Sequence, residues 1–386
     1  MAQKNWYKAP ILGALTWFGF HCGSGFASGT QLKIYALEYG SVGLIAPLVA
    51  WVACAWFIAI VTEYARVVKA KSYRDVGSTI YWDNPILGRV ILLLWDLIVF
   101  SAMIVTSGAC VSGFGTLLNS LFGVPYYVGC GVFVIFMICL MCFGSHALER
   151  LGKVTIPMVV MFLILAGAGI ATGFDNLKAV LTTELGAPME VGATIGNAVW
   201  SGFTYGCIQI SFLHTSCIIG GRFQERKQTF LFIAVGFILN LGCMMMGVLA
   251  LLADYPGCMA FEMPILEIAT NIDGPMGMVL LIIFNIVLLL AYITTVGSLL
   301  AGSIARYTPL VHRAIKNEFI CKVAVVLVIM GGASVLSTLG LEGVLDKGYG
   351  MLSRLKMPIW FFPIIILGPI SIHRARRKQK LEQETE

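Results

Sequence analysis

Charged residues are scarce in this chain of 386 residues. Asp, Glu, Lys and Arg make up 12% of the sequence, whereas ordinary soluble domains carry about 25%. Apolar residues make up 58%, the mean hydropathy is +0.87, and the few charges stand in short clusters between long apolar runs. This distribution excludes a soluble globular protein and predicts an all-α polytopic membrane protein.

The sequence also lacks the patterns of a membrane-embedded enzyme. It has no clustered His/Asp/Glu metal motif and no Ser/His/Asp arrangement at matched depth. Its 11 cysteines fall almost all inside apolar runs, where cysteine behaves as a small hydrophobe. We therefore expect no catalysis, no disulfide framework and no cofactor other than Na⁺ as a coupling ion.

Ten apolar runs are long enough to span a bilayer, which takes about 20 residues each. With the N-terminus placed inside, all but five of the 26 Lys and Arg residues flank the inner face. This bias predicts cytoplasmic termini in a plasma (inner) membrane and no nucleic-acid partner. The segment Phe261–Asn271 is helical in pattern but too short to span, which predicts an outer lid. The five exceptions are Lys33, Lys178, Lys347, Arg354 and Lys356; the runs are 10–37, 41–68, 86–118, 124–143, 153–173, 192–217, 228–253, 275–305, 319–340 and 356–372.

Two of these runs are interrupted, and they stand five spans apart. The first, Pro10–Glu38, has four glycines within Gly19–Gly29, and each glycine costs about 1 kcal/mol relative to alanine in a helix. The sixth, around Ile195–Gln209, has small and polar residues at its centre. Five crossings reverse the chain direction, so a five-helix unit repeats upside down, and paired interrupted helices in such halves point to a transport site. We expect one domain, 1–386, with inverted repeats at about 9–173 and 190–372 and a cytoplasmic tail at 373–386.

The interruption in the first run frees backbone groups with partial charges of both signs. Freed carbonyls at Gly19–Cys22 suit Na⁺ or an amine, and freed N–H groups at Ser24–Ala27 suit a carboxylate. At about 1.5 Å per residue, His21 and Asp96 reach similar depths near the midplane, where ionisable groups usually face a cavity or a partner. The two side chains can exchange a proton, bind a substrate ammonium group or neutralise each other, and the sequence leaves open whether they touch.

Two structural alternatives accompany these assignments. The glycines of the first run also fit a small-xxx-small packing face between helices. Thr294 and Thr295 of the eighth run either complete a sodium shell or bond back to their own helix.

Residues 23–31, Gly-Ser-Gly-Phe-Ala-Ser-Gly-Thr-Gln, resemble the GAGFASGQE signature of the YkvI-like membrane proteins. These belong to the amino acid–polyamine–organocation (APC) superfamily with the LeuT-type fold. The resemblance implies ten helices with the first and sixth broken, and a substrate bound between the unwound parts. By position it places Gly23–Gly25 and Ser201–Phe203 beside the substrate, and Gly19, Cys22, Thr294 and Thr295 around sodium.

The expected function is cation-coupled symport by alternating access, which imports a small amino acid or organic amine. Sodium is preferred as the coupling ion; proton-coupled amine transport through His21 and Asp96 is the alternative, and a channel is less favoured because no pore signature repeats. The expected partners are the substrate and membrane lipid, while the substrate's identity and the oligomeric state are left open. The predicted substrate-binding residues are His21, Gly23, Ser24, Gly25, Phe26, Asp96, Trp200, Ser201, Gly202, Phe203 and Tyr205.

Overall fold

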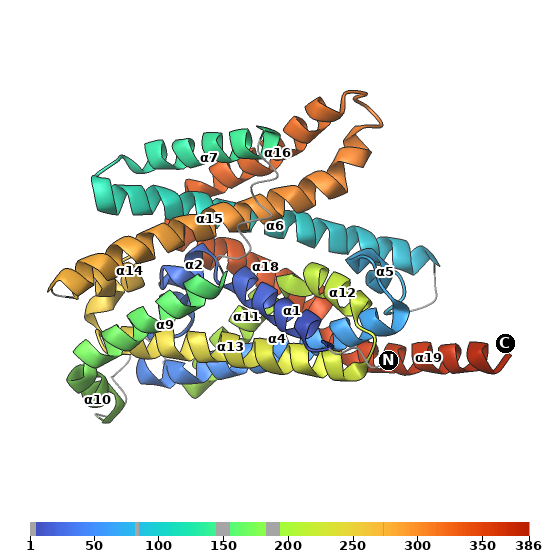
Figure 1. Ribbon diagram of the computed structural model, residues 1–386, viewed down its shortest axis with the longest axis horizontal. Helices are drawn as coiled ribbons and strands as arrows, with labels where there is room; N and C mark the ends of the chain where they lie inside the picture. Colours follow the sequence, from blue (N-terminus) through green and yellow to red (C-terminus); the bar gives the residue numbers. More distant parts are fainter. Residues whose placement is uncertain (1–4, 82–84, 144–154, 183–193, 273, 386) are drawn as a thin grey trace.

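The computed structural model describes residues 5–81, 85–143, 155–182, 194–272 and 274–385, and all regular elements in these ranges are helices (Figure 1). Six helices are long and apolar enough to cross a membrane. A seventh span forms if α9 (Thr155–Thr172) and α10 (Phe174–Thr182), bent by 75°, count together. The shorter α7 (Tyr126–Phe143) and two broken helices bring the described spans to ten. The prediction of an all-α polytopic membrane protein is confirmed.

The first span is broken at the glycine-rich segment, as predicted. It consists of α1 (Lys8–His21), α2 (Ser24–Ala27) and α3 (Thr30–Tyr35). The helix stops after His21 because Gly23 takes an extended conformation, with ψ of −167°. A second change of direction occurs at Gly29, whose φ of +86° strongly favours glycine.

The sixth span is also broken, but later than predicted. α11 (Ile195–Gln209) continues through the whole stretch that was expected to unwind, and the change comes at the 3₁₀ turn η4 (Ile210–Phe212) before α12 (Leu213–Arg222). Gly202 and Gly206 instead let α11 approach α4: a Cβ on either would lie 2.5 or 2.6 Å from a backbone oxygen of α4. The small residues of this helix form a packing face.

The remaining helices sort into two groups. α4 (Ile45–Val68) packs against both parts of the sixth span, and α13 (Arg226–Leu252) packs against α4 and against α1 and α3 of the first span. α6 (Pro85–Phe122), α7, α15 (Gly274–Val311) and α16 (Glu318–Ser337) pack with one another (Figure 1). Helices five spans apart therefore share a group; the division into two inverted five-helix repeats stays a prediction. The start of the second repeat, placed near 190, lies outside the described residues. Short elements complete the connections: η1 (Leu37–Leu44), α5 (Tyr73–Gly77) and η5 (Gly257–Ala260).

The helix that contains the tenth span begins earlier than the predicted apolar run at 356–372. It runs from α17 (Gly340–Gly343) to the end of α19 as one helical stretch, Gly340–Glu382. Lys347, Arg354 and Lys356, which the sequence placed outside the spans, lie on this helix. Figure 1 shows that α19 ends at the same end of the bundle where α1 begins. The other parts of this span are η6 (Val344–Gly348), α18 (Tyr349–Lys356), η7 (Met357–Phe361) and α19 (Phe362–Thr385).

The predicted lid segment is helical, as expected. α14 (Pro264–Thr270) packs against the far end of the first span, where the Ile265 amide donates to the Ser28 carbonyl at 3.0 Å. The Thr30 hydroxyl donates to the Glu262 carbonyl at 2.5 Å, and Lys33 Nζ donates to the Phe261 carbonyl at 2.9 Å and pairs with Glu342. The lid is therefore attached to α2 and α3 by backbone and side-chain hydrogen bonds.

Candidate functional site

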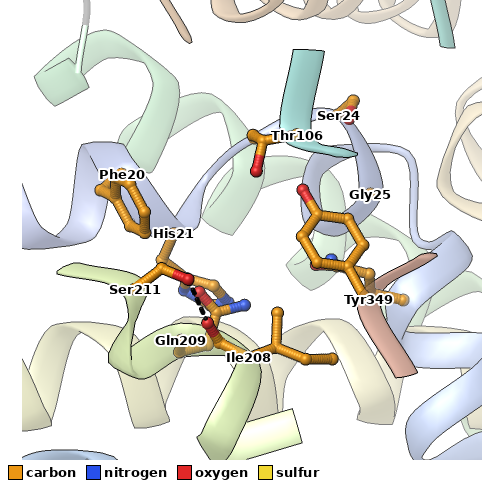
Figure 2. Close-up of a pocket in the computed structure, with 11 residues that line it drawn as sticks. Phe20, His21, Ser24, Gly25, Thr106, Ile208, Gln209, Ser211 and Tyr349 are labelled. Carbon is orange, nitrogen blue, oxygen red and sulfur yellow. Dashed lines mark hydrogen bonds between the residues drawn. The ribbon is translucent and has the colours of Figure 1, made fainter. Parts of the chain in front are cut away.

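A small polar cavity lies between the two helix breaks. Its volume is about 30 Å³, which is room for roughly two or three water molecules. The residues that line it come from four places: the first span, the break of the sixth span, α6, and α18, which contributes Tyr349. Figure 2 shows the hydroxyl ends of Thr106 and Tyr349 pointing toward each other. The lining residues are Phe20, His21, Gly23, Ser24, Gly25, Gln31, Thr106, Ile208, Gln209, Ser211 and Tyr349.

His21 is the last residue of α1 and connects the first span to the sixth. Its Nε2 lies 2.7 Å from the Tyr205 hydroxyl, which donates to Gln31 Oε1 at 3.2 Å. Aromatic rings enclose the imidazole: the ring centroids of Phe26 and Trp51 lie 4.1 and 4.5 Å away. His21 therefore lines the cavity, whereas Tyr205 and Phe26 contact the imidazole without lining the cavity.

Four predicted residues of the sixth helix do not reach this cavity. Trp200 is 59% exposed and, with Ser201, lines a separate, wider cavity of about 350 Å³. Gly202 packs on α4, and the Phe203 ring lies 4.9 Å from that of Phe361. The structure thus does not bring residues 200–203 together with Gly23, Ser24 and Gly25.

The sixth helix contributes instead the residues at its actual break. Ile208, Gln209 and Ser211 line the cavity. From the sequence, Gln209 is a candidate for an inter-helix hydrogen bond first and a ligand second, and Ile208 and Ser211 are not predicted. A signal for them was present, since Gln209 and Ser211 are polar residues in an apolar run. The prediction instead followed the glycines that precede these residues in the sequence.

Asp96 lies far from His21. It accepts hydrogen bonds from Tyr73 of α5 and from Arg306 at 2.8 Å, and Arg74 is 3.8 Å away. The α6 residue at the cavity is Thr106, about 15 Å farther along the helix. The predicted matched depth was wrong, because α6 has 38 residues and spans about 57 Å, and it is Thr106 rather than Asp96 that lies level with His21.

Contacts are described for two of the four predicted sodium ligands, Thr294 and Cys22. The Thr294 hydroxyl donates to the Ala291 carbonyl of its own helix at 3.0 Å, which was the alternative noted from the sequence. Cys22 lines a second cavity of about 10 Å³, which it shares with Leu288 of α15, and Thr294 lies about 9 Å farther along that helix. Gly19 and Thr295 are not among the described residues that line this cavity.

Comparisons of the whole chain find similar structures but no match in sequence. No family model and no curated protein matches it. A mutant manganese transporter from Eremococcus coleocola aligns with a TM-score of 0.61 at 13% identity, over 96% of this chain and 86% of that one. The chain has the LeuT-type fold.

Two further solved structures agree with this assignment. MhsT in complex with L-phenylalanine aligns with a TM-score of 0.57 at 14% identity, over 95% of this chain and 97% of that one. A Na⁺-coupled sialic acid symporter aligns at 0.58 and 13%, over 95% and 88%. Identities this low establish the fold and leave the substrate and the coupling ion to be argued from the site.

Proposed function

We propose that this protein is a cation-coupled secondary active transporter that imports a small amino acid or organic amine by alternating access. The substrate binds between the broken parts of the first and sixth helices. The observation that carries the proposal is the polar cavity, which lies at both breaks of a LeuT-type fold. The glycine signature at 23–31 supports placement among the YkvI-like members of the APC superfamily.

The chemistry of the cavity supports an amine or amino acid as substrate. Hydroxyls, carboxamides and one imidazole line it, and these neutral groups can accept hydrogen bonds from an ammonium group and donate them to a carboxylate. The lining residues include Ser24, Gln31, Thr106 and Gln209. Such a set fixes the orientation of a small polar molecule without an opposite charge of its own.

Substrate entry requires the cavity to grow. About 30 Å³ is too small for any amino acid, so the structure corresponds to a closed form. The lid α14 covers the far end of α2 and α3. We propose that α14 and the second half of the first helix move apart from the neighbouring helices to open the outer side.

The coupling cation has two candidate forms. In the sodium form, the carbonyls of Gly19 and Cys22 and the hydroxyls of Thr294 and Thr295 close around Na⁺ when the helices rearrange. In the proton form, an ionisable group inside the bundle takes up and releases H⁺. We propose an inner (plasma) membrane location with both termini in the cytoplasm, consistent with the distribution of Lys and Arg.

The test combines binding and transport by purified protein. Thermal-shift screening against the twenty common L-amino acids, putrescine and choline, with and without Na⁺, identifies ligands. Uptake of ¹⁴C-labelled ligand into proteoliposomes then distinguishes transport from channel flow, because only a coupled transporter accumulates label against its gradient. The absence of both ligand-induced stabilisation and uptake would overturn the proposal.

A further inference from the structure

Lys356 is a completely buried lysine at the break of the sixth helix. Its side chain is 0% exposed, although it stands at the end of α18 inside the tenth span. A charged group at such a position is expensive and generally has a function. None of the roles described so far uses it.

The partners of Lys356 are neutral. Its Nζ donates to the Ile208 carbonyl at 3.0 Å and to the Ser211 hydroxyl at 2.5 Å. Among the residues that the structure describes, no carboxylate forms an ion pair with it. The Ile208 carbonyl is in the last turn of α11, at the electronegative end of that helix, so partial rather than full charges face the amine.

The surrounding titratable groups are also neutral or weakly charged. The thiols of Cys54 on α4 and Cys207 on α11 face Lys356, as does the imidazole of His214 on α12. α6, which also packs against α18, presents Thr106 and Cys110 near Tyr349. A permanent ammonium charge here has no permanent counter-charge, and buried charged groups without one tend to lose their charge.

Lys356 Nζ has two hydrogen-bond partners in either protonation state. Lys356 Nζ, Ser211 Oγ and the Ile208 carbonyl form a closed triangle, since Ser211 also donates to Ile208 at 2.9 Å. With an ammonium group, Nζ donates to both oxygens. After loss of H⁺ the N–H electron pair remains on nitrogen as a lone pair, and the Ser211 hydrogen can turn from the Ile208 carbonyl to Nζ.

This triangle forms part of the wall of the candidate substrate cavity. Ile208 and Ser211 both line it, so a change at Nζ changes which hydrogen bonds Ser211 can offer to a bound molecule (Figure 2). We propose that Lys356 binds and releases the coupling proton, so that the transported cation is H⁺. The inference rests on the proposed function and names the coupling ion and its carrier.

The experiment uses full-length protein in proteoliposomes loaded with a pH-sensitive dye, in Na⁺-free buffer. The probes are a ¹⁴C-labelled mixture of the twenty common L-amino acids and a labelled mixture of putrescine and choline. Wild type should accumulate label and acidify the interior together. Lys356→Met should lose at least tenfold in pH-driven accumulation while it retains exchange of internal for external label, which needs no net proton movement.

Two further variants sharpen the result. Lys356→Arg keeps the charge but cannot release it, so exchange should persist without pH-driven accumulation. Lys322→Gln removes a surface lysine that pairs with Glu318, and it should behave as wild type.

Three outcomes would overturn the proposal. In the first, Lys356→Met matches wild type in proton influx and accumulation. In the second, wild-type uptake requires Na⁺ and moves no proton. Either result removes Lys356 as carrier and leaves transport intact. A wild type that takes up and exchanges neither mixture would overturn the proposed function as well.

Discussion

His21 and Tyr205 link the two broken helices through a single hydrogen bond, with 2.7 Å between Nε2 and the phenolic oxygen. Tyr205 has one hydroxyl hydrogen, and its oxygen also lies 3.2 Å from Gln31 Oε1. Which of the two atoms donates in the His21–Tyr205 bond depends on the tautomer of the imidazole. The wall of the cavity and the interface between the two broken helices are thus held by the same three side chains.

Tyr205→Phe should destabilise the protein. It leaves His21 Nε2 and Gln31 Oε1 without their partner in a buried site, at a cost of about 1–3 kcal/mol. Thermal unfolding in detergent should show a lower midpoint than wild type. Tyr127→Phe, at a residue that is 67% exposed, provides the control, and equal midpoints for the two variants would show that the link contributes nothing.

His21 and Asp96 should act independently. Asp96 pairs with Arg306, and the cavity lies about 15 Å farther along α6. The unfolding free energies of His21→Gln and Asp96→Asn should therefore add in the double variant to within about 0.5 kcal/mol. Strong non-additivity, together with a flattened pH profile of uptake in His21→Gln, would restore the His21–Asp96 pair as the proton path.

The double variant Thr294→Ala, Thr295→Ala distinguishes the two forms of coupling. If Na⁺ is bound by these hydroxyls, the variant should lose Na⁺-dependent ligand stabilisation in thermal-shift measurements. If Lys356 carries a proton instead, ligand stabilisation should not depend on Na⁺ in wild type or variant. The second result is the one we expect, and a wild-type response to Na⁺ that the variant lacks would favour sodium.

Gly25→Val should cripple transport without preventing membrane insertion. A Cβ at this position would lie 2.6 Å from the Gln31 side chain and 2.8 Å from that of Leu345, so the cavity wall must shift. Gly331→Val is the matched control, because nothing lies within 4 Å of its added Cβ. We expect at least a tenfold loss of uptake for Gly25→Val alone, measured at equal amounts of inserted protein; comparable uptake by both variants would show that the break tolerates a side chain.

Glu63→Gln should lower thermal stability more than a surface control. Glu63 pairs with Arg66 at 2.7 Å and with Arg376 of α19, and it accepts from Thr229 at 3.0 Å. Loss of its charge leaves two arginines with weakened partners, at a cost of about 1–2 kcal/mol after allowance for partial exposure. The control Glu318→Gln breaks only an exposed pair with Lys322. An equal effect of both substitutions on the unfolding midpoint would show that the ion pairs of Glu63 do not stabilise the protein.

The fold could be predicted from local properties of the sequence, whereas much of the site could not. Hydropathy predicts the spans, and the density of glycines predicts the break at Gly23. The break of the sixth helix was misplaced because Gly202 and Gly206 suit helix packing as well as unwinding, and only the partner helix α4 decides between them. Lys356 was missed because its neutral partners, Ile208 and Ser211, lie about 150 residues away in sequence.

The glycine contacts of the sixth helix have a mechanical consequence. Gly202 and Gly206 before the break and Gly220 after it all bring this helix against the α4 backbone, where a Cβ would lie 2.5–2.6 Å from a carbonyl oxygen. α4 therefore contacts the sixth span on both sides of its break, so α11 and α12 cannot bend freely relative to each other at η4. We therefore expect α4, α11 and α12 to stay together as one rigid unit when the cavity opens, while α14 and the second half of the first helix move relative to it.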